Sequence, residues 1–251
     1  FSDKNILIRV LMYIERYLYN NSDLLISPLK NFDKYLAENK VVTAFKFIPQ
    51  SYFNFNYDSI SKIDIDLKPF SKIGIYAGSV GSFYKLEQLV KFFPHKLKSK
   101  IAIIIIGDGD KFDELSDLIK KMDLNNFFII PSKNHKDLLA YYKVSDFAIG
   151  LFPDHNNLYK YGLCPLKTYD YMFNKLPILF IGNKSYLDLD STGIIECQFN
   201  NKNALIGSLN KIYNMEKSDL KKMGILNSKI VQINNSPDSI SKNFMEILND
   251  I

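Results

Sequence analysis

The densest set of reactive side chains lies between Tyr159 and Met172, in the stretch YKYGLCPLKTYDYM. A Gly and a Pro predict a turn, and we expect a helix to begin near Leu166. The exposed N–H groups of that helix start, together with Lys167, would form a compact site for an anion such as phosphate. Asp170 lies one turn after Lys167 on the same helical face, where a carboxylate can accept two adjacent sugar hydroxyls. A Lys/Asp pair on a solvated helix surface has the same spacing, so both interpretations are open.

A second candidate anion site is the small-residue turn Gly78-Ser79-Val80-Gly81-Ser82. We expect this turn to lead from a strand into a helix, whose first N–H groups can hold a phosphate because glycine lets the chain approach closely. An ordinary strand-to-helix turn is the alternative. The spacing is not that of the dinucleotide fingerprint G-x-G-x-x-G, and no P-loop Lys-Ser/Thr follows.

A third turn, Gly107-Asp108-Gly109-Asp110, precedes another predicted helix. Asp110 is placed to cap that helix, and Asp is common at caps and turns for local reasons. We therefore interpret Asp108 and Asp110 as structural residues.

These turns must be positioned by the alternating elements between Ile73 and Ile181. Short apolar runs alternate there with amphipathic stretches, which is typical of repeated βα units around a parallel sheet covered by helices on both faces. In such a sheet, ligands bind at the carboxyl ends of the strands. The predicted strands are Lys72–Ala77, Ile101–Ile106, Phe127–Ile130, Phe147–Leu151 and Pro177–Ile181, and the predicted helices are Tyr84–Phe93, Lys111–Met122, His135–Lys143 and Leu166–Phe173.

The remaining chain is predicted to contribute flanking elements. Upstream we expect a helix (Ile6–Tyr19), a strand (Asp23–Ser27), a helix after Pro28 and a strand (Val41–Ile48). One strand-helix-strand unit cannot enclose a core, so residues 1–50 are interpreted as the remnant of another domain and 51–71 as a linker. Residues 72–234 form the main predicted domain. It ends with a strand at Gly193–Phe199 and helices at Ala204–Asn214 and Asp219–Ile233, and 235–251 form a last helix.

Composition narrows the classes of protein. The chain has 251 residues, 47% of them apolar, which is enough for a core, and a net charge of +5. The longest apolar run is far shorter than the ~20 residues of a membrane-spanning helix. No Lys/Arg block predicts nucleic-acid binding, although weak attraction to anionic membrane surfaces stays open. Cys164 and Cys197 lack neighbouring ligands at metal spacing, so we expect no metal site and a cytoplasmic protein.

The order of these motifs resembles the group 1 family of retaining GT-B glycosyltransferases, whose two Rossmann-like domains face each other. The resemblance rests on IGIYAGSVGS, IIIIGDGDKF, FFIIPS, DLLAYYKVSDFAIGLFP and GLCPLKTYDYMFNKLPILF, taken in this order. It covers roughly Ile73–Ile181 and implies that this part is the C-terminal, donor-binding domain. The implied donor is a UDP- or GDP-sugar, with no cofactor required.

The resemblance also implies roles for individual residues. Asp170 stands where the second acid of the family's E-x7-E motif binds the ribose. Lys167 and the amides of Leu163, Cys164 and Leu166 would serve the diphosphate, and Lys85 matches a phosphate-neutralising lysine of some members. Lys167 and Lys85 are thus the implied catalytic residues. The remaining candidate contacts are the turn residues Gly78, Ser79 and Gly81, the loop residue Gly162 and the base-pocket residues Pro131, Ser132 and Lys133. His155 is a further candidate because it lies in the loop before the phosphate segment.

One position departs from the family pattern, because the first acid of E-x7-E falls on Gly162. The leading hypothesis is transfer of a hexose, with retention, to a glycan or lipid-linked acceptor in bacterial cell-surface polysaccharide biosynthesis. We place it in the cytoplasm, with peripheral association at the inner face of the plasma membrane left open. Gly162 motivates an alternative, a nucleotide-sugar-binding module without turnover. A nucleotide-sugar epimerase of the same fold is the third interpretation.

Overall fold

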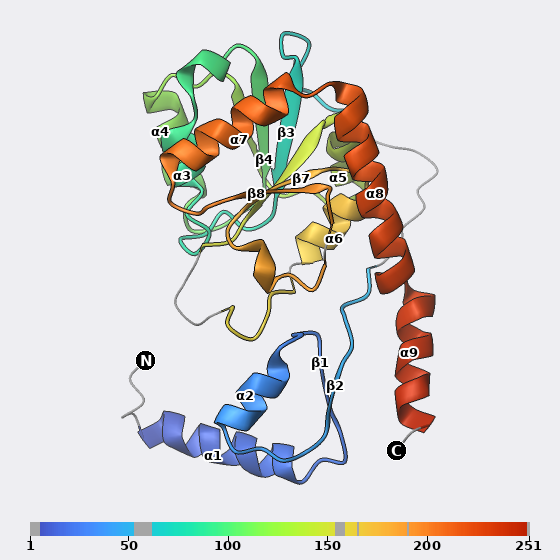
Figure 1. Ribbon diagram of the computed structural model, residues 1–251. Helices are drawn as coiled ribbons and strands as arrows, with labels where there is room; N and C mark the ends of the chain where they lie inside the picture. The colour runs from blue at the N-terminus through green and yellow to red at the C-terminus, as the bar shows by residue number, and fades with distance from the viewer. Residues whose placement is uncertain (1–5, 53–61, 154–158, 165, 190, 250–251) are drawn as a thin grey trace.

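The computed structural model describes residues 6–52, 62–153, 159–164, 166–189 and 191–249. Its centre is a parallel six-stranded sheet with the strand order β5-β4-β3-β6-β7-β8 (Figure 1). The strands are β3 (Lys72–Ala77), β4 (Ile101–Ile106), β5 (Phe127–Ile130), β6 (Phe147–Leu151), β7 (Ile178–Ile181) and β8 (Ile194–Cys197). The expected α/β class with a helix-flanked parallel sheet is confirmed.

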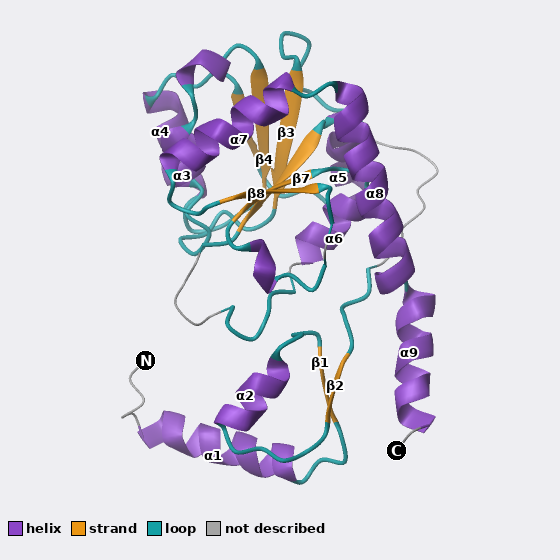
Figure 2. Cartoon of the chain, in the orientation of Figure 1, coloured by secondary structure: helices purple, strands orange, loops and turns teal. Residues whose placement is uncertain are grey.

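Helices cover both faces of the sheet, as Figure 2 shows. They are α3 (Glu87–Phe92), α4 (Phe112–Lys121), α5 (His135–Val144), α6 (Leu166–Phe173), α7 (Lys202–Asn214) and α8 (Lys217–Asn235), with short 3-10 turns at His95–Leu97 and Lys184–Tyr186. Because every residue of β3, β4, β6 and β7 is buried, these strands need apolar side chains on both sides rather than alternation. One core cluster joins α3, α4 and α7 to the sheet, and a second joins α5, α6 and α8 to the other face.

The first four predicted strands of the sheet have the predicted bounds, whereas β7 begins at Ile178 rather than Pro177. β8 is shorter than the predicted Gly193–Phe199. The two N-terminal strands, predicted over Asp23–Ser27 and Val41–Ile48, are also shorter. The helix predicted over Tyr84–Phe93 is shorter at its start. Lys85 has φ +55°, in the left-handed region, so the backbone cannot continue a right-handed helix through it. The helix α3 therefore begins at Glu87.

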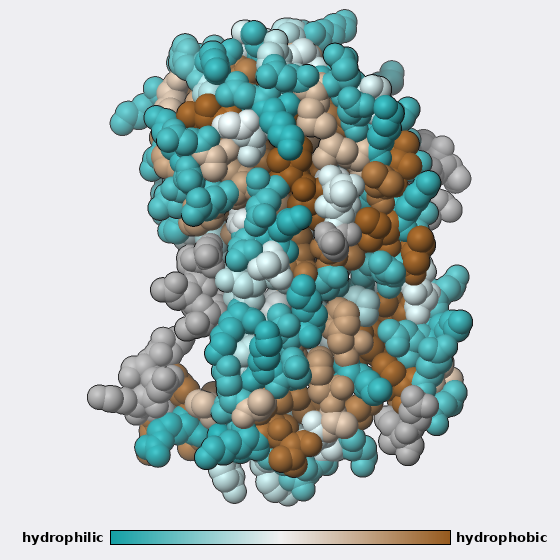
Figure 3. Space-filling view, in the orientation of Figure 1, coloured by the Kyte–Doolittle hydropathy of each residue, from teal (hydrophilic) through white to brown (hydrophobic). Residues whose placement is uncertain are grey.

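The N-terminal segment consists of α1 (Ile6–Asn20), β1 (Leu25–Ser27), α2 (Phe32–Glu38) and β2 (Phe45–Phe47). β1 and β2 pair in parallel, which is the strand-helix-strand unit expected from the sequence. No residue of α1 is buried, and apolar side chains gather at this end of the molecule (Figure 3). Within the described residues, no helix is long and apolar enough to cross a membrane.

The end of α8 holds the chain that leads from the N-terminal segment to the sheet. Asn235 is fully buried, and its side chain donates to the Gln50 carbonyl at 3.0 Å. The Asn235 carbonyl accepts from the Tyr52 amide at 3.2 Å. The last helix, α9 (Pro237–Asn249), continues from this point toward the N-terminal segment (Figure 1). The domain limits given above stay predictions.

The sheet opens between β3 and β6. These strands pair only at Gly74 with Phe147 and at Ile75 with Ala148, whereas β3 and β4 pair along their whole length. Beyond the last pair, the buried hydroxyl of Tyr171 on α6 takes the place of a strand. It accepts from the Ala77 amide at 2.8 Å and donates to the Ala77 carbonyl at 3.0 Å. Helix α6 is thereby fixed to the end of β3.

This contact predicts that Tyr171→Phe lowers the free energy of unfolding by about 1–3 kcal/mol, because a buried backbone N–H and C=O lose their partner. Urea denaturation measures the change. Tyr141→Phe is the matched control, since Tyr141 packs in the same core cluster and its hydroxyl makes no hydrogen bond to the described residues. Equal stability of Tyr171→Phe and wild type would contradict the role of this contact.

Candidate functional site

The candidate site lies where the strand order reverses, at the carboxyl ends of β3 and β6. Crevices at such a point are where open parallel sheets bind ligands. The loop after β3 and the start of α6 meet there, because the Tyr171 contact with Ala77 brings α6 to the end of β3.

Lys167 on α6 extends into a group of aromatic rings at this point. Its Nζ lies 3.8 Å from the ring centroid of Tyr84, 4.8 Å from that of Tyr76 and 5.5 Å from that of Phe152. The same nitrogen donates to the Tyr76 hydroxyl at 3.2 Å. Ring faces attract an ammonium group, and these contacts hold the amine without neutralising it.

The charge of Lys167 is not balanced by a carboxylate within the described part of the chain. Burial is what lowers the pKa of its ammonium group, to about 8. An anion that reached this amine would stabilise its charged form. Lys167 is therefore a buried amine among aromatic rings and not one partner of a surface ion pair.

Gly78 makes room for this amine. Its φ of +155° is a backbone conformation that L side chains rarely adopt, and a Cβ there would lie 3.0 Å from Lys167 Nζ. The Val80 amide donates to the Asp108 carbonyl at 2.9 Å, so the loop after β3 crosses close to the loop after β4. Gly78 and Lys167 are thus in direct proximity, while Ser79 takes part through its carbonyl, which accepts from the Tyr76 hydroxyl.

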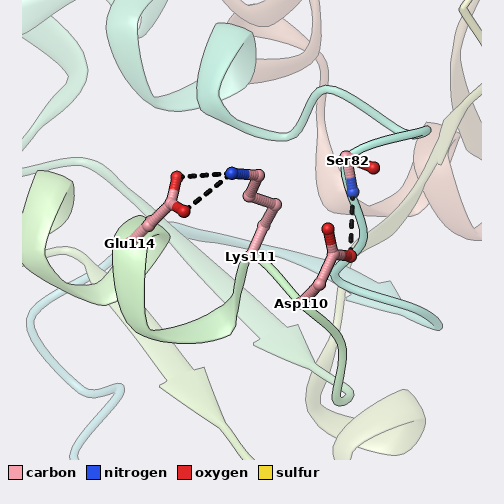
Figure 4. A network of polar contacts seen from close by, with 4 residues as sticks. All are labelled: Ser82, Asp110, Lys111 and Glu114. Carbon is pink, nitrogen blue, oxygen red and sulfur yellow. Dashed lines mark hydrogen bonds and ion pairs between the residues drawn. The ribbon is translucent and has the colours of Figure 1, made fainter.

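Two expectations about these loops were wrong. The Gly78–Ser82 turn does not open a helix, since residues 83–86 separate it from α3. Asp110 does not cap α4, because the cap position falls on Lys111, which makes no side-chain cap bond. Asp110 instead accepts from the Ser82 amide at 3.1 Å, while Lys111 pairs with Glu114 (Figure 4). Helix α4 starts later than expected, so the carboxylate links two loops.

Asp170 lies on a shallow pocket of about 230 Å³, whose lining residues come from α5, α6 and the chain before the sheet: Ser51, Tyr52, His135, Leu166, Lys167, Tyr169 and Asp170. The Tyr142 hydroxyl donates to Asp170 Oδ2 at 2.8 Å, and His135 Nε2 lies 3.3 Å from Oδ1. Burial and the nearby Asp170 carboxylate raise the pKa of Tyr142, so its phenol stays a neutral donor. Lys167 and Asp170 therefore both line this pocket.

The loop before α6 is held by the N-terminal segment. Gly162 has φ +117°, and a Cβ there would lie 3.1 Å from the Lys30 amide nitrogen. The Asn31 amide donates to the Tyr161 carbonyl at 3.0 Å, and Lys30 Nζ donates to the Leu187 carbonyl at 2.6 Å. A side chain at position 162 would therefore meet both an unfavourable backbone conformation and the chain of the N-terminal segment.

The three residues of this loop that were predicted to contact a diphosphate have different surroundings. The Leu163 amide donates to the Tyr186 carbonyl at 2.7 Å, so in this structure it already has a partner within the protein. The Cys164 thiol lies 3.6 Å from Gln50 Oε1, and burial raises its pKa. Leu166 begins α6 on the exposed side of the pocket.

Lys85 lies apart from Lys167. It lines a different pocket of about 400 Å³ between α3 and α4, together with Lys91, Lys111 and Glu114. The structure does not bring the two predicted catalytic lysines together.

The loop after β5 is joined to the loop after β4. The Ser132 amide donates to Asp108 Oδ1 at 3.1 Å, and the Ser132 hydroxyl donates to the other oxygen. These bonds lower the pKa of the Asp108 carboxyl, which fits its expected structural role. Pro131 and Lys133 flank Ser132 and are exposed.

The sequence reasoning missed several residues of the site. His135, Tyr76, Tyr84 and Tyr142 all fall in predicted helices or strands and were given no role in a site. His135 does follow a strand at the carboxyl edge of the sheet, and this position was a usable signal. The tyrosines gave no signal, because a buried phenol and a core ring look alike in sequence.

The candidate His155 lies outside the described residues. No cluster of His, Cys, Asp or Glu within the described residues could hold a metal ion.

Comparisons with solved structures agree with this architecture. Sucrose-phosphate synthase from Thermosynechococcus elongatus superposes with a TM-score of 0.66 at 15% identity, over 96% of this chain and 61% of that protein. Anabaena HepE, solved with UDP and glucose, gives 0.68 at 11% identity, over 97% and 67%. A glycosyltransferase from Rickettsia africae gives 0.69 at 15% identity, over 94% and 66%. The chain thus spans about two-thirds or less of each of these proteins.

The parallel sheet flanked by helices is the fold of the GT-B glycosyltransferases. The family model described as "Glycosyl transferases group 1" matches residues 62–224, and the chain belongs to this family. No curated protein sequence matches the chain significantly. The resemblance read from the sequence motifs is confirmed.

The geometry around position 162 predicts that Gly162→Glu, which restores the family's first acid, lowers the free energy of unfolding by about 1–3 kcal/mol through backbone strain and contact with Lys30. Thermal unfolding measures the change. Gly162→Ala is the control, because it adds the same Cβ without charge and should give most of the loss. A stable Gly162→Glu variant with the Asn31 amide still protected from hydrogen exchange would contradict this account.

Proposed function

We propose that this protein is a hexosyltransferase whose described sheet domain binds a nucleotide-diphosphate sugar and gives up the hexose to a glycan or lipid-linked acceptor. The observation that carries the proposal is the Lys167 amine, enclosed by rings, without a carboxylate partner within the described residues, and next to Gly78 at the carboxyl end of β3. Membership of the group 1 family supports it, as do the UDP and UDP-glucose complexes of Anabaena HepE.

In the proposed complex, the diphosphate lies against Lys167 and the start of α6, and the ribose hydroxyls bind Asp170. The bond between the anomeric carbon and the diphosphate oxygen breaks, and the electron pair leaves with the diphosphate. Positive charge then develops on the sugar ring, and the lysine stabilises the negative charge on the leaving group. The acceptor hydroxyl oxygen forms the new bond on the face that the diphosphate left, which retains the configuration, and the hydroxyl proton passes to the departing diphosphate oxygen. No resident cofactor takes part in this proposal.

We further propose a place in bacterial cell-surface polysaccharide biosynthesis, on the cytoplasmic side of the membrane. The net charge of +5 would attract an anionic membrane surface, and the apolar side chains exposed on α1 would favour peripheral contact. Both parts of this proposal rest on the family and on these surface properties.

A second candidate function, a binding module without turnover, is favoured by Gly162, which supplies no carboxylate to the sugar. Incubation with UDP-hexoses and GDP-hexoses, followed by chromatography of the products, separates the candidates. Release of free UDP or GDP together with hexose, or with a glycosylated acceptor, supports the transferase. Binding without any release supports the module, and an isomerised donor in the absence of acceptor would identify an epimerase.

The site geometry predicts that Lys167→Ala weakens UDP binding by about 10-fold to 100-fold, the loss expected for a charge-assisted hydrogen bond, and leaves uridine within about twofold. Asp170→Asn should weaken UDP and uridine alike, because both carry the ribose. Isothermal titration with UDP, uridine, GDP and guanosine measures these changes. Lys143→Ala, on α5 outside the pocket, is the control. Equal losses for UDP and uridine in Lys167→Ala would remove this lysine from the phosphate site.

The lowered pKa of Lys167, about 8, predicts how UDP binding depends on pH. The ammonium form binds the diphosphate, so the affinity should fall as the pH rises from 7 through 8, approaching a tenfold loss per pH unit until the loss equals that of Lys167→Ala. An ordinary lysine would hold its charge to about pH 10. Uridine carries the same base, so the ratio of the two affinities isolates the lysine. A ratio that stays constant from pH 7 to pH 9 would count against this assignment.

A further inference from the structure

Tyr76 lies beneath the candidate site and has no role in the function proposed above. Its side chain is fully buried at the end of β3, and it is among the largest buried side chains of the core. A core ring in this position needs no hydroxyl, and phenylalanine would fill the same space. The hydroxyl therefore calls for a separate explanation.

The contacts of this hydroxyl have a fixed direction. It donates its one hydrogen to the Ser79 carbonyl at 2.8 Å. It can then only accept from Lys167 Nζ, which lies 3.2 Å away. Burial raises the pKa of the Tyr76 phenol far above its usual value, so the group stays a neutral dipole with this orientation.

These two bonds connect parts of the chain that are far apart in sequence. Ser79 belongs to the loop after β3, and Lys167 belongs to α6, 91 residues after Tyr76. The ring of Tyr76 also lies under the amine, with 4.8 Å between Nζ and the ring centroid. Tyr76 thus holds the glycine turn and the lysine in one arrangement.

The arrangement matters because a free lysine side chain is flexible. Ordering its rotatable bonds on binding would cost roughly 2 kcal/mol, and a site that is ordered beforehand avoids part of this cost. An ammonium group has three hydrogens. One is used at Tyr76, and among the described residues no acceptor takes the other two. The tyrosine therefore fixes the amine and leaves it able to bind an anion.

We infer that Tyr76 is a positioning residue of the diphosphate site: its buried hydroxyl ties the Ser79 carbonyl to the Lys167 amine, so that the turn and the lysine meet the diphosphate as one preformed unit. This inference rests on the proposed function, because it concerns the same site. It adds a residue that touches neither the nucleotide nor the sugar.

The test is a double-mutant cycle with UDP as the probe. Tyr76→Phe keeps the ring and removes the hydroxyl, and it should weaken UDP binding by about fivefold to tenfold, the loss expected for one hydrogen bond. Uridine affinity should stay within about twofold. In the Lys167→Ala background, Tyr76→Phe should add less than about twofold, because its effect passes through the lysine. A merely structural role would give the same loss in both backgrounds.

Tyr213→Phe is the matched control. Lys100 Nζ lies 4.8 Å from the centroid of the Tyr213 ring, so the variant removes a hydroxyl from another ring that carries a lysine, on α7 and outside the pocket. Its UDP affinity should equal that of the wild type. Thermal unfolding of each variant checks that the fold is kept. If Tyr76→Phe fails to fold, 3-fluorotyrosine at position 76 supplies the readout: its fluorine resonance should move when UDP is added, and should not move in Lys167→Ala.

The outcomes separate this inference from the proposed function. If Lys167→Ala loses UDP affinity and Tyr76→Phe does not, the inference is overturned and the donor site stands. A loss that is equal for UDP and uridine, or equal in the two backgrounds, also overturns it. If the wild-type chain binds neither UDP nor GDP, the proposed function fails and the inference fails with it.

Discussion

The site depends on the pair of hydrogen bonds between the Tyr171 hydroxyl and the backbone of Ala77. A parallel sheet that splays at its switch point leaves a buried N–H and C=O without a neighbouring strand, and such groups are costly to bury unpaired. Tyr171 satisfies both from helix α6. The same helix carries Lys167 and Asp170, so the requirement of the sheet for hydrogen bonds fixes the distance between the loop after β3 and the residues proposed to bind the donor.

The N-terminal segment imposes a second constraint. Its chain at Leu29 and Lys30 lies against Gly162, and Glu38 on α2 pairs with Lys160 and accepts from Tyr161. The missing first acid of the family motif therefore has a packing explanation as well as a chemical consequence. The space in which an acid would extend from the loop is partly occupied by backbone from another part of the chain.

Much of the fold could be predicted from sequence, because burial on both faces demands continuous apolar runs such as Ile101–Ile106. Helix α6 was predicted with its observed bounds, and Lys167 and Asp170 with it. The wrong predictions lie where a single backbone angle, or a contact between residues distant in sequence, determines the local structure. Because Lys85 has a left-handed conformation, α3 is shorter than predicted. Asp110 accepts from the Ser82 amide instead of capping α4 as predicted. The partnership of His135 with Asp170 depends on how α5 packs beside α6, which no local pattern encodes.

The many tyrosines around Lys167 and Asp170 have a practical consequence. The chain contains sixteen tyrosines and no tryptophan, so its near-ultraviolet absorption and emission come almost entirely from phenol rings. Tyr52, Tyr76, Tyr84 and Tyr142 all lie on or under the site. A molecule that enters the crevice changes the surroundings of several of these rings at once, and the native protein thereby carries its own optical reporter of occupancy without an added dye.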